Sequence, residues 1–252
     1  MLRHRVIARL DIKGNNVVKG IHMEGLRVIG DPVELALKYY EQNAHELLYI
    51  DTVASLYGRN QLEELIRRTS DEIYIPITVG GGITGTETSR SLFNAGADKV
   101  AINTHAIRKP EIINNLAEIL GSQALTVSIQ AKKMGSGWEA LIDGGRERTG
   151  IGVSEWVKNV YERGAGEILL TSIDQDGTMA GFDLEIINSI TIDVPLIACG
   201  GLGCVQDAID AIDAGADAVC CGSALHYNKL TIGEIDDGIN KEQFQDKKTC
   251  AA

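Results

Sequence analysis

The stretch NAGADKV at residues 94–100 returns as DAGADAV at residues 213–219, with five of its seven positions identical. The two copies lie 119 residues apart, close to half of the 252-residue chain. The same offset aligns four further pairs: Pro76 with Pro195, Gly81 with Gly200, Gly82 with Gly201, and Thr104 with Ser223. A repeat of this length predicts that the chain consists of two halves built on one plan.

Short, almost continuously hydrophobic runs alternate with amphipathic helical runs in both halves. Such runs are typical of parallel strands that are buried on both faces. We expect strands at 5–11, 46–51, 75–79 and 99–102 in the first half, and at 124–130, 167–172, 195–199 and 218–221 in the second. Four strand–helix units, repeated once, predict a (β/α)8 TIM barrel with an internal twofold half-barrel repeat. An open doubly wound sheet would not account for the duplication.

The expected domain organisation follows from this repeat. No segment has the composition of an interdomain linker. We therefore predict one barrel domain over residues 1–252, with half-barrels at about 1–120 and 121–230 and a C-terminal helix and tail at 231–252.

Local signals place some of the connections. Asp31 followed by Pro32 predicts the start of a helix, and Ser154 is the expected cap of the helix at 155–163. Residues 133–149 have the pattern of an inserted hairpin. Residues 14–30 are expected to form a long loop after the first strand and are a candidate lid.

The composition argues against several classes of function. The chain has 24 Lys and Arg against 35 Asp and Glu, a net charge of −11, so it lacks the basic surface that binds nucleic acid. No apolar run approaches the roughly 20 residues that span a bilayer. The N-terminus meets the charged Asp11 too early for a signal peptide. We therefore expect a cytoplasmic protein that binds neither nucleic acid nor membrane.

The cysteines are odd in number and lack the spacing of metal ligands. They are Cys199, Cys204, Cys220, Cys221 and Cys250. We interpret them as free thiols in a reducing compartment, mostly buried in strands. We expect neither a metal ion nor a cofactor.

Glycine and hydroxyl residues follow equivalent strands in the two halves. Residues 80–82, Asn103 and Thr104 have the counterparts Gly200, Gly201, Gly222 and Ser223. Active sites of TIM barrels lie where the strands end, and glycine lets backbone N–H groups approach an anion. Because the repeat places the two groups on opposite sides of the barrel mouth, we predict a ligand with a phosphate at each end. The alternative is that the glycines serve only tight turns.

Asp11 ends the first strand and is expected to point into the mouth. Its counterpart in the repeat is Gln130, which forms hydrogen bonds but exchanges no proton at neutral pH. The chain therefore keeps one carboxylate of a possible acid–base pair. Other strand ends carry Asp51, Asp174 and Asp176, and for the first two of these, capping of a loop is an equal alternative. Lys19 either closes over an anion or is solvated.

Charged residues begin four of the predicted strands, at the opposite end of the barrel. They are Arg5, Glu46, Lys99 and Glu167. Two cations and two anions would form a neutral, mutually paired ring. One interpretation is a structural salt-bridge layer, and the other is a polar gate through which a small molecule enters the barrel.

Five motifs carry a resemblance to a known family. They are LDIKGNNVVKG (10–20), GDPVEL (30–35), TVGGGI (78–83), AGADKVAINT (95–104) and RGAGEILLTSID (163–174). The chain resembles the cyclase subunit of imidazole glycerol phosphate synthase, HisF, from its start to about His226. The last motif and the charged ring favour this cyclase over its relative, the isomerase of the same histidine pathway.

The resemblance implies a barrel that docks a glutaminase subunit on its N-terminal face. Ammonia released there would pass the charged ring and cross the barrel to the mouth. It would react with a linear ribulosyl-formimino carboxamide ribotide that carries two terminal phosphates. The products would be imidazole glycerol phosphate, used in histidine biosynthesis, and an aminoimidazole carboxamide ribotide.

The resemblance also implies roles for particular residues. The phosphates would be bound by Gly82, Asn103 and Thr104 at one end and by Gly177, Gly201, Gly222 and Ser223 at the other. Further residues fall on active-site positions of the family: Lys19, Thr78, Thr171 and Asp176. The two catalytic aspartates of the family fall on Asp11 and Gln130.

Two departures from the family lie at the centre of this site. Gln130 replaces the second aspartate, and Arg9 stands where the family usually has cysteine. Replacing one member of an acid–base pair typically costs about 10²–10⁴ in rate. One alternative is therefore a relative of the cyclase that forms an amidine on a nucleotide-linked sugar for surface polysaccharide. Another is a non-catalytic barrel that only binds and activates a glutaminase.

Overall fold

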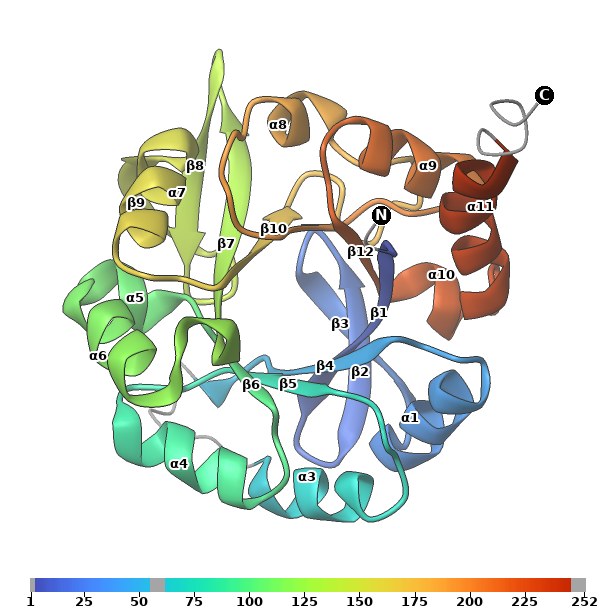
Figure 1. The fold of residues 1–252 in the computed structure, drawn as a ribbon, viewed down its shortest axis with the longest axis horizontal. Coiled ribbons are helices and arrows are strands. Elements are labelled where there is room, and N and C mark those ends of the chain that lie inside the picture. The colour runs from blue at the N-terminus through green and yellow to red at the C-terminus, as the bar shows by residue number, and fades with distance from the viewer. Residues whose placement is uncertain (1–2, 55–61, 246–252) are drawn as a thin grey trace.

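The computed structural model describes residues 3–54 and 62–245, and its centre is a closed barrel of eight parallel strands (Figure 1). In their order around the barrel the strands are β1 (Arg5–Lys13), β4 (Glu46–Asp51), β5 (Ile77–Gly80), β6 (Lys99–Ile102), β7 (Leu125–Met134), β10 (Glu167–Ser172), β11 (Leu196–Cys199) and β12 (Ala218–Cys221). Pairing of β12 with β1 closes the barrel. The predicted TIM barrel is thereby confirmed, and every predicted strand overlaps an observed one.

The first strand of each half-barrel is long and is followed by two antiparallel strands. β1 is followed by β2 (Asn16–Ile21) and β3 (Glu24–Gly30), and β7 is followed by β8 (Gly137–Ile142) and β9 (Glu147–Gly152). The hairpin predicted at 133–149 is therefore confirmed.

The prediction of a long loop at 14–30 is wrong, because this segment forms the β2–β3 hairpin. Residues 17–19 of β2 are buried. The turn between the strands uses two non-glycine residues with positive φ, His22 at 53° and Met23 at 62°. Residues other than glycine rarely adopt a positive φ. Because His22 and Met23 stand where turns usually have glycine, the sequence did not reveal this turn.

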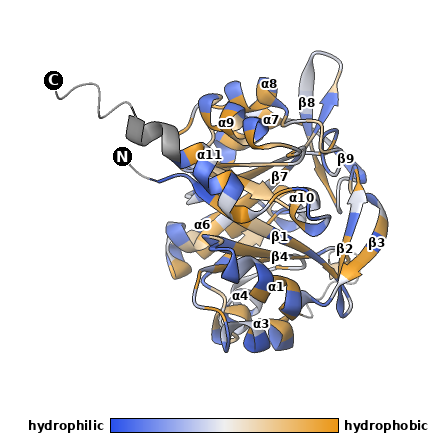
Figure 2. Ribbon diagram, turned by 90° about the vertical axis from the view of Figure 1, so that its right-hand side faces the viewer, coloured by the Kyte–Doolittle hydropathy of each residue, from blue (hydrophilic) through white to orange (hydrophobic). Residues whose placement is uncertain are grey.

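Helices surround the barrel and cover the outer face of its strands (Figure 1). In the described residues they are α1 (Pro32–Glu41), α3 (Glu63–Ser70), α4 (Thr86–Asn94), α5 (Thr104–Arg108), α6 (Glu111–Leu120), α7 (Val153–Glu162), α8 (Leu184–Asn188), α9 (Val205–Asp213), α10 (Ser223–His226) and α11 (Ile232–Gln245), with a short 3₁₀ helix at Ser122–Ala124. Helix α11 and the β2–β3 hairpin lie on opposite sides of the molecule (Figure 2).

Of the two helix starts predicted, one is right. The Asp31 carboxylate accepts hydrogen bonds from Val33 N at 2.8 Å and Glu34 N at 3.1 Å, and Pro32 opens α1. Ser154 is not a cap. Strand β9 runs directly into α7, which begins at the buried Val153 with Gly152 as its cap residue and no capping side chain.

The barrel interior is layered along each strand, because alternate residues point inward. On β1 the inward residues are Arg5, Ile7, Arg9 and Asp11. Ile7 belongs to an apolar layer inside the barrel, together with Leu48, Ala101, Leu169, Ile197, Cys199, Ala218 and Cys220. A much larger apolar layer fills the space between strands and helices. The charged N-terminal end and the polar mouth are therefore separated by an apolar section.

The cysteines that the structure describes are free thiols. Cys199, Cys220 and Cys221 are buried in β11 and β12, as expected, whereas Cys204 is exposed at the start of α9. Cys250 lies outside the described residues. Within residues 3–54 and 62–245, the helices are too short or too polar for a membrane span.

Candidate active site

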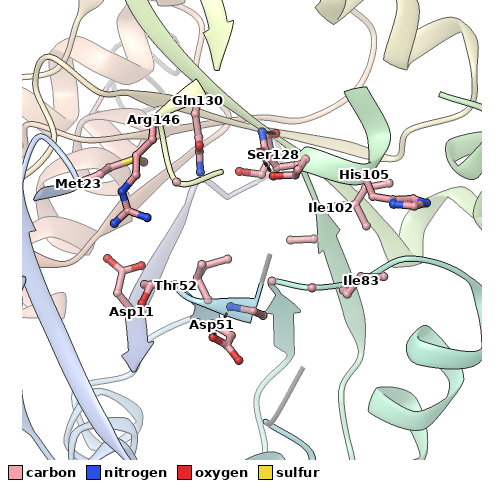
Figure 3. A pocket seen from close by; sticks show the side chains of 18 of the residues that line it. Asp11, Met23, Asp51, Thr52, Ile83, Ile102, His105, Ser128, Gln130 and Arg146 are labelled. Carbon is pink, nitrogen blue, oxygen red and sulfur yellow. Dashed lines mark hydrogen bonds between the residues drawn. The ribbon is translucent and has the colours of Figure 1, made fainter. Parts of the chain in front are cut away.

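The mouth of the barrel holds a cavity of about 150 Å³ beside the first half-barrel (Figure 3). Its lining includes Asp11, Gly82, Asn103, Thr104 and Gln130, all of which the sequence singled out. Figure 3 shows Asp11 and Gln130 directed toward the same space from β1 and β7. The expected counterparts of the repeat thus share one cavity.

A second, smaller cavity of about 20 Å³ lies beside the second half-barrel. Its lining includes Asp176, Gly177, Gly201, Gly222 and Ser223. Two side chains, those of Arg9 and Lys19, line both cavities. The residues predicted to bind two phosphates therefore fall into two groups, one on each of two cavities that share Arg9 and Lys19.

A buried charge network joins the two cavities. The Arg9 Nε donates to Asp11 Oδ1 at 2.8 Å, and Lys19 Nζ lies 3.4 Å from Asp11 Oδ2. Lys19 Nζ also donates to both carboxylate oxygens of Asp176 at 2.8 Å. All four side chains are buried. Lys19 is therefore not a solvated lysine: the β2–β3 hairpin carries it into the mouth, where two cations balance two carboxylates.

These contacts change the protonation of Asp11. Burial alone would raise the pKa of this carboxyl, but the adjacent Arg9 and Lys19 charges outweigh burial and lower it. Burial would likewise lower the pKa of Lys19, yet Asp11 and Asp176 raise it. At neutral pH the site therefore holds an ionised Asp11 beside a protonated Lys19.

Gln130 lines the first cavity and keeps one hydrogen-bonding atom unpaired. Its Oε1 is buried and has no hydrogen-bond partner among the residues that the structure describes. A buried acceptor without a partner costs roughly 1–3 kcal/mol. Pairing this oxygen with a donor would therefore be favourable.

The hydroxyl residues of the two groups occupy equivalent places. Thr104 begins α5 and Ser223 begins α10. The Thr104 hydroxyl donates to Asn103 Oδ1 at 3.2 Å and accepts from Asp143 N at 3.0 Å, so it ties the rim to the β8–β9 hairpin. Ser223 differs, because within the described residues its buried Oγ is unpaired.

The glycines of the second group are also required by close backbone packing. A Cβ on Gly201, whose φ is 113°, would lie 1.9 Å from Gly181 O. A Cβ on Gly177, whose φ is 79°, would lie 2.3 Å from Gly20 O. Tight turns therefore explain these glycines whether or not an anion binds.

At the opposite end of the barrel, the four predicted charges form a closed ring. Arg5 Nη1 lies 2.9 Å from Glu46 Oε2, and its Nη2 lies 2.7 Å from Glu167 Oε1. Lys99 Nζ bridges the same two carboxylates at 3.0 and 2.9 Å. The glutamates are buried, whereas Arg5 and Lys99 retain partial exposure. The ring therefore covers the lower end of the apolar layer.

Thr78 lies apart from the other predicted substrate residues. Its hydroxyl donates to Glu46 Oε1 at 2.6 Å, so the side chain belongs to the charged ring and not to the mouth. The reason is its place near the start of the four-residue strand β5. Thr171, on β10, does lie near the mouth: it is fully buried and accepts from Arg9 Nη1 at 3.4 Å.

Two other candidates among the aspartates organise loops. Asp51 Oδ1 accepts from Val53 N at 3.1 Å and Ala54 N at 2.9 Å. Asp174 accepts from Lys132 Nζ at 3.0 Å and Lys133 N at 2.8 Å. The capping alternative therefore describes both, although Asp51 also lines the first cavity.

The sequence analysis did not single out every residue of the site. Arg146, in the turn between β8 and β9, lines the first cavity and is directed toward it near Asp11 and Gln130 (Figure 3). The predicted hairpin contained it, but only the folding of that hairpin over the mouth distinguishes it from an exposed surface arginine.

Comparison with known proteins gives one consistent family. The family model "Histidine biosynthesis protein" matches residues 5–231. The chain is 53% identical over 206 residues to the imidazole glycerol phosphate synthase subunit HisF of Legionella pneumophila, which covers 81% of this chain and 97% of that protein. It is 48% identical over 243 residues to the protein of the same name from Bifidobacterium adolescentis, covering 93% and 95%. For that of Thermococcus onnurineus the identity is 44% over 239 residues, covering 94% and 95%. The chain therefore belongs to the histidine biosynthesis protein family.

Proposed function

We propose that this protein is the cyclase subunit of imidazole glycerol phosphate synthase. It uses ammonia from a glutaminase subunit to convert a linear ribulosyl-formimino carboxamide ribotide into imidazole glycerol phosphate. The observation that carries the proposal is the pair of cavities that share Arg9 and Lys19, because such a site suits a long molecule with an anion at each end. The names of the relatives described above favour this function over amidination of a sugar and over a non-catalytic barrel.

The two phosphates of the substrate would lie at the two ends of this site. Asn103, Thr104 and the backbone at Gly82 would bind one of them in the larger cavity. The backbone at Gly177, Gly201 and Gly222 would bind the other, with the unpaired Ser223 hydroxyl as a donor. Satisfying this buried hydroxyl is a gain that a tight turn alone does not provide.

Asp11 is the proposed general base. Because Arg9 and Lys19 keep it ionised, it accepts a proton from the attacking nitrogen or from the ribulosyl chain. Protonated Lys19 stands 3.4 Å from it and stabilises negative charge that develops on the substrate. Gln130 orients the substrate through its unpaired oxygen and transfers no proton.

The charged ring is the proposed entrance for ammonia. Arg5, Glu46, Lys99 and Glu167 cover the N-terminal end of the barrel, where the glutaminase would dock. Above the ring lies the apolar layer, which favours neutral ammonia over ammonium because burying an unpaired charge is costly. Ammonia would then emerge at the mouth beside Asp11.

The proposal is tested by turnover of the linear ribotide with ammonium salt at high pH, measured as release of imidazole glycerol phosphate. We expect slow turnover by the natural protein and a rate about 100-fold higher for Gln130→Asp, which restores the second carboxylate. Gln123→Asp, the same change at an exposed site, should leave the rate unchanged. The same variants should complement a strain that lacks the histidine-pathway cyclase. Absence of turnover by both the natural protein and Gln130→Asp would overturn the proposal.

A further inference from the structure

Two cysteines inside the barrel stand side by side. Cys199 and Cys220 are register partners on the adjacent parallel strands β11 and β12. Both belong to the apolar layer inside the barrel, so their side chains project to the same face. Neighbouring strands lie about 4.8 Å apart, within the roughly 4.4–6.8 Å between Cα atoms that disulfides require. The next residue, Cys221, packs in the outer apolar layer on the other face of the sheet.

An arginine contacts one of these thiols. Arg9 Nη1 lies 3.3 Å from Cys199 Sγ and donates to it. A hydrogen bond from the Cys220 thiol lowers the pKa of Cys199, burial opposes this effect, and the Arg9 charge lowers it further. Burial raises the pKa of Cys220. The pair therefore consists of a thiolate-forming cysteine beside a protonated one, which is the division of labour of an attacking and a resolving thiol.

The pair is accessible only to a small reagent. Cys199 and Cys220 are buried, yet both line the second cavity, whose volume is about 20 Å³. A space of roughly this size holds one water-sized molecule. Hydrogen peroxide is little larger than water, whereas bulky oxidants and alkylating reagents do not fit.

We propose that Cys199 and Cys220 form a peroxide-sensitive dithiol that closes to a disulfide across the second cavity. The Cys199 thiolate attacks one oxygen of hydrogen peroxide, the O–O bond breaks, and hydroxide leaves as Cys199 becomes a sulfenic acid. The Cys220 sulfur then displaces the sulfenic oxygen, which leaves as water after taking up the thiol proton. Overall, two thiols lose two electrons and two protons, and one peroxide is reduced to two waters. The proposal stands whether or not the proposed function is correct.

The test uses a variant that retains only this pair, with Cys204→Ser, Cys221→Ala and Cys250→Ser. The folded protein is treated with hydrogen peroxide, then denatured and alkylated, and its intact mass is measured. We expect a loss of about 2 Da, corresponding to two hydrogens, no alkylation, and full alkylation after dithiothreitol. In the natural protein, cleavage at the intervening aspartates should release a linked pair of peptides: the cleavage sites are Asp207, Asp210, Asp213 and Asp217.

The matched control retains Cys199 and Cys221 instead, with Cys204→Ser, Cys220→Ala and Cys250→Ser. Its two thiols lie on opposite faces of the sheet, so it should form no intramolecular disulfide. Two alkylated thiols in the peroxide-treated pair variant, or oxidation that stops at one cysteine with addition of oxygen, would overturn the proposal. So would equal disulfide formation in the control.

The part assigned to Arg9 has its own test. In Arg9→Met the Cys199 thiolate loses its nearest cation, and the rate of disulfide formation at neutral pH should fall by about tenfold. The deficit should shrink as pH is raised, because the thiolate then forms without help. An unchanged rate at neutral pH would show that Arg9 does not activate the thiol.

Discussion

At the scale of single residues, the charges of the site are set by Arg9, a cation beside Asp11, and by Gln130, which is neutral. Arg9 lies at the barrel mouth and contacts Asp11, Thr171 and Cys199. Opposite Asp11, the side chain of Gln130 is neutral. Carboxylates at both positions 11 and 130 would carry two negative charges. In this chain the single negative charge of Asp11 is cancelled by the positive charge of Arg9. The proposed base is thereby held ionised, and any acid in the reaction has to come from elsewhere. Arg9 does not release its proton, so Lys19, 3.4 Å from Asp11, is the nearby candidate.

Replacing Arg9 by Met should therefore shift the acidic limb of the pH–rate profile to higher pH. The pKa of Asp11 is lowered in the folded protein, so its pairing stabilises the fold above the carboxyl's ordinary pKa and is lost as pH falls through the lowered value. At neutral pH the variant should lose roughly 3–5 kcal/mol of unfolding free energy, measured by urea denaturation, because a buried ion pair is broken. Arg90→Met, at an exposed helical position, serves as the control. A pH profile that stays in place would show that Lys19 alone sets the protonation of Asp11.

At the scale of elements, the antiparallel hairpins complete the site. The β2–β3 hairpin is held over the mouth by Lys19, which pairs with Asp176, and by His22, whose N–H donates to Asp176 O at 2.7 Å. The β8–β9 hairpin brings Arg146 to the first cavity. Neither contact follows from the strand pattern of the barrel, because each depends on an appended segment folding back across the strand ends.

Lys19→Met should release the β2–β3 hairpin from the loop after β10. We expect faster amide hydrogen exchange across residues 16–30, with the barrel strands unaffected, because the buried ion pair to Asp176 is lost. Lys13→Met, at an exposed position on β1, is the matched control. Exchange that remains slow in Lys19→Met would mean that backbone hydrogen bonds alone hold the hairpin.

The sequence was most informative where a pattern repeats and least where distant segments meet. The half-chain repeat and the hydrophobic runs predicted all eight parallel strands, because burial on both faces leaves a continuous signal. Ser154 failed as a cap, since the buried Val153 starts the helix earlier. Thr78 was assigned to the mouth through the family resemblance, whereas its hydroxyl contacts Glu46 in the charged ring because it lies near the start of the four-residue strand β5. The pairing of Lys19 with Asp176 spans 157 residues and has no local signature.

At the scale of the whole molecule, the barrel has two differently built ends. One carries the charged ring, and the other carries the two cavities. The apolar layer between them isolates the charges at one end from those at the other. This separation predicts that the ends can be impaired independently.

Arg5→Ala should impair use of glutamine but not of ammonium salt. Without Arg5 the ring loses contacts to Glu46 and Glu167, so the proposed entrance and docking face are altered while the mouth is not. We expect weaker capture of the glutaminase subunit in a pull-down and at least a tenfold lower glutamine-dependent rate, with the ammonium-dependent rate within about twofold. Arg27→Ala, on the distant β2–β3 hairpin, should change neither glutamine-dependent property. Equal loss of both rates would contradict separate ends.

The position of Arg9 on the walls of both cavities has a consequence for ligand design. If the Arg9 guanidinium moves toward an anion bound in one cavity, it moves away from the other cavity. Two fragments that each mimic one phosphate end of the substrate will therefore not bind with independent affinities. Their binding energies should fall short of additivity when both are present, whereas one continuous molecule is free to share that cation along its length.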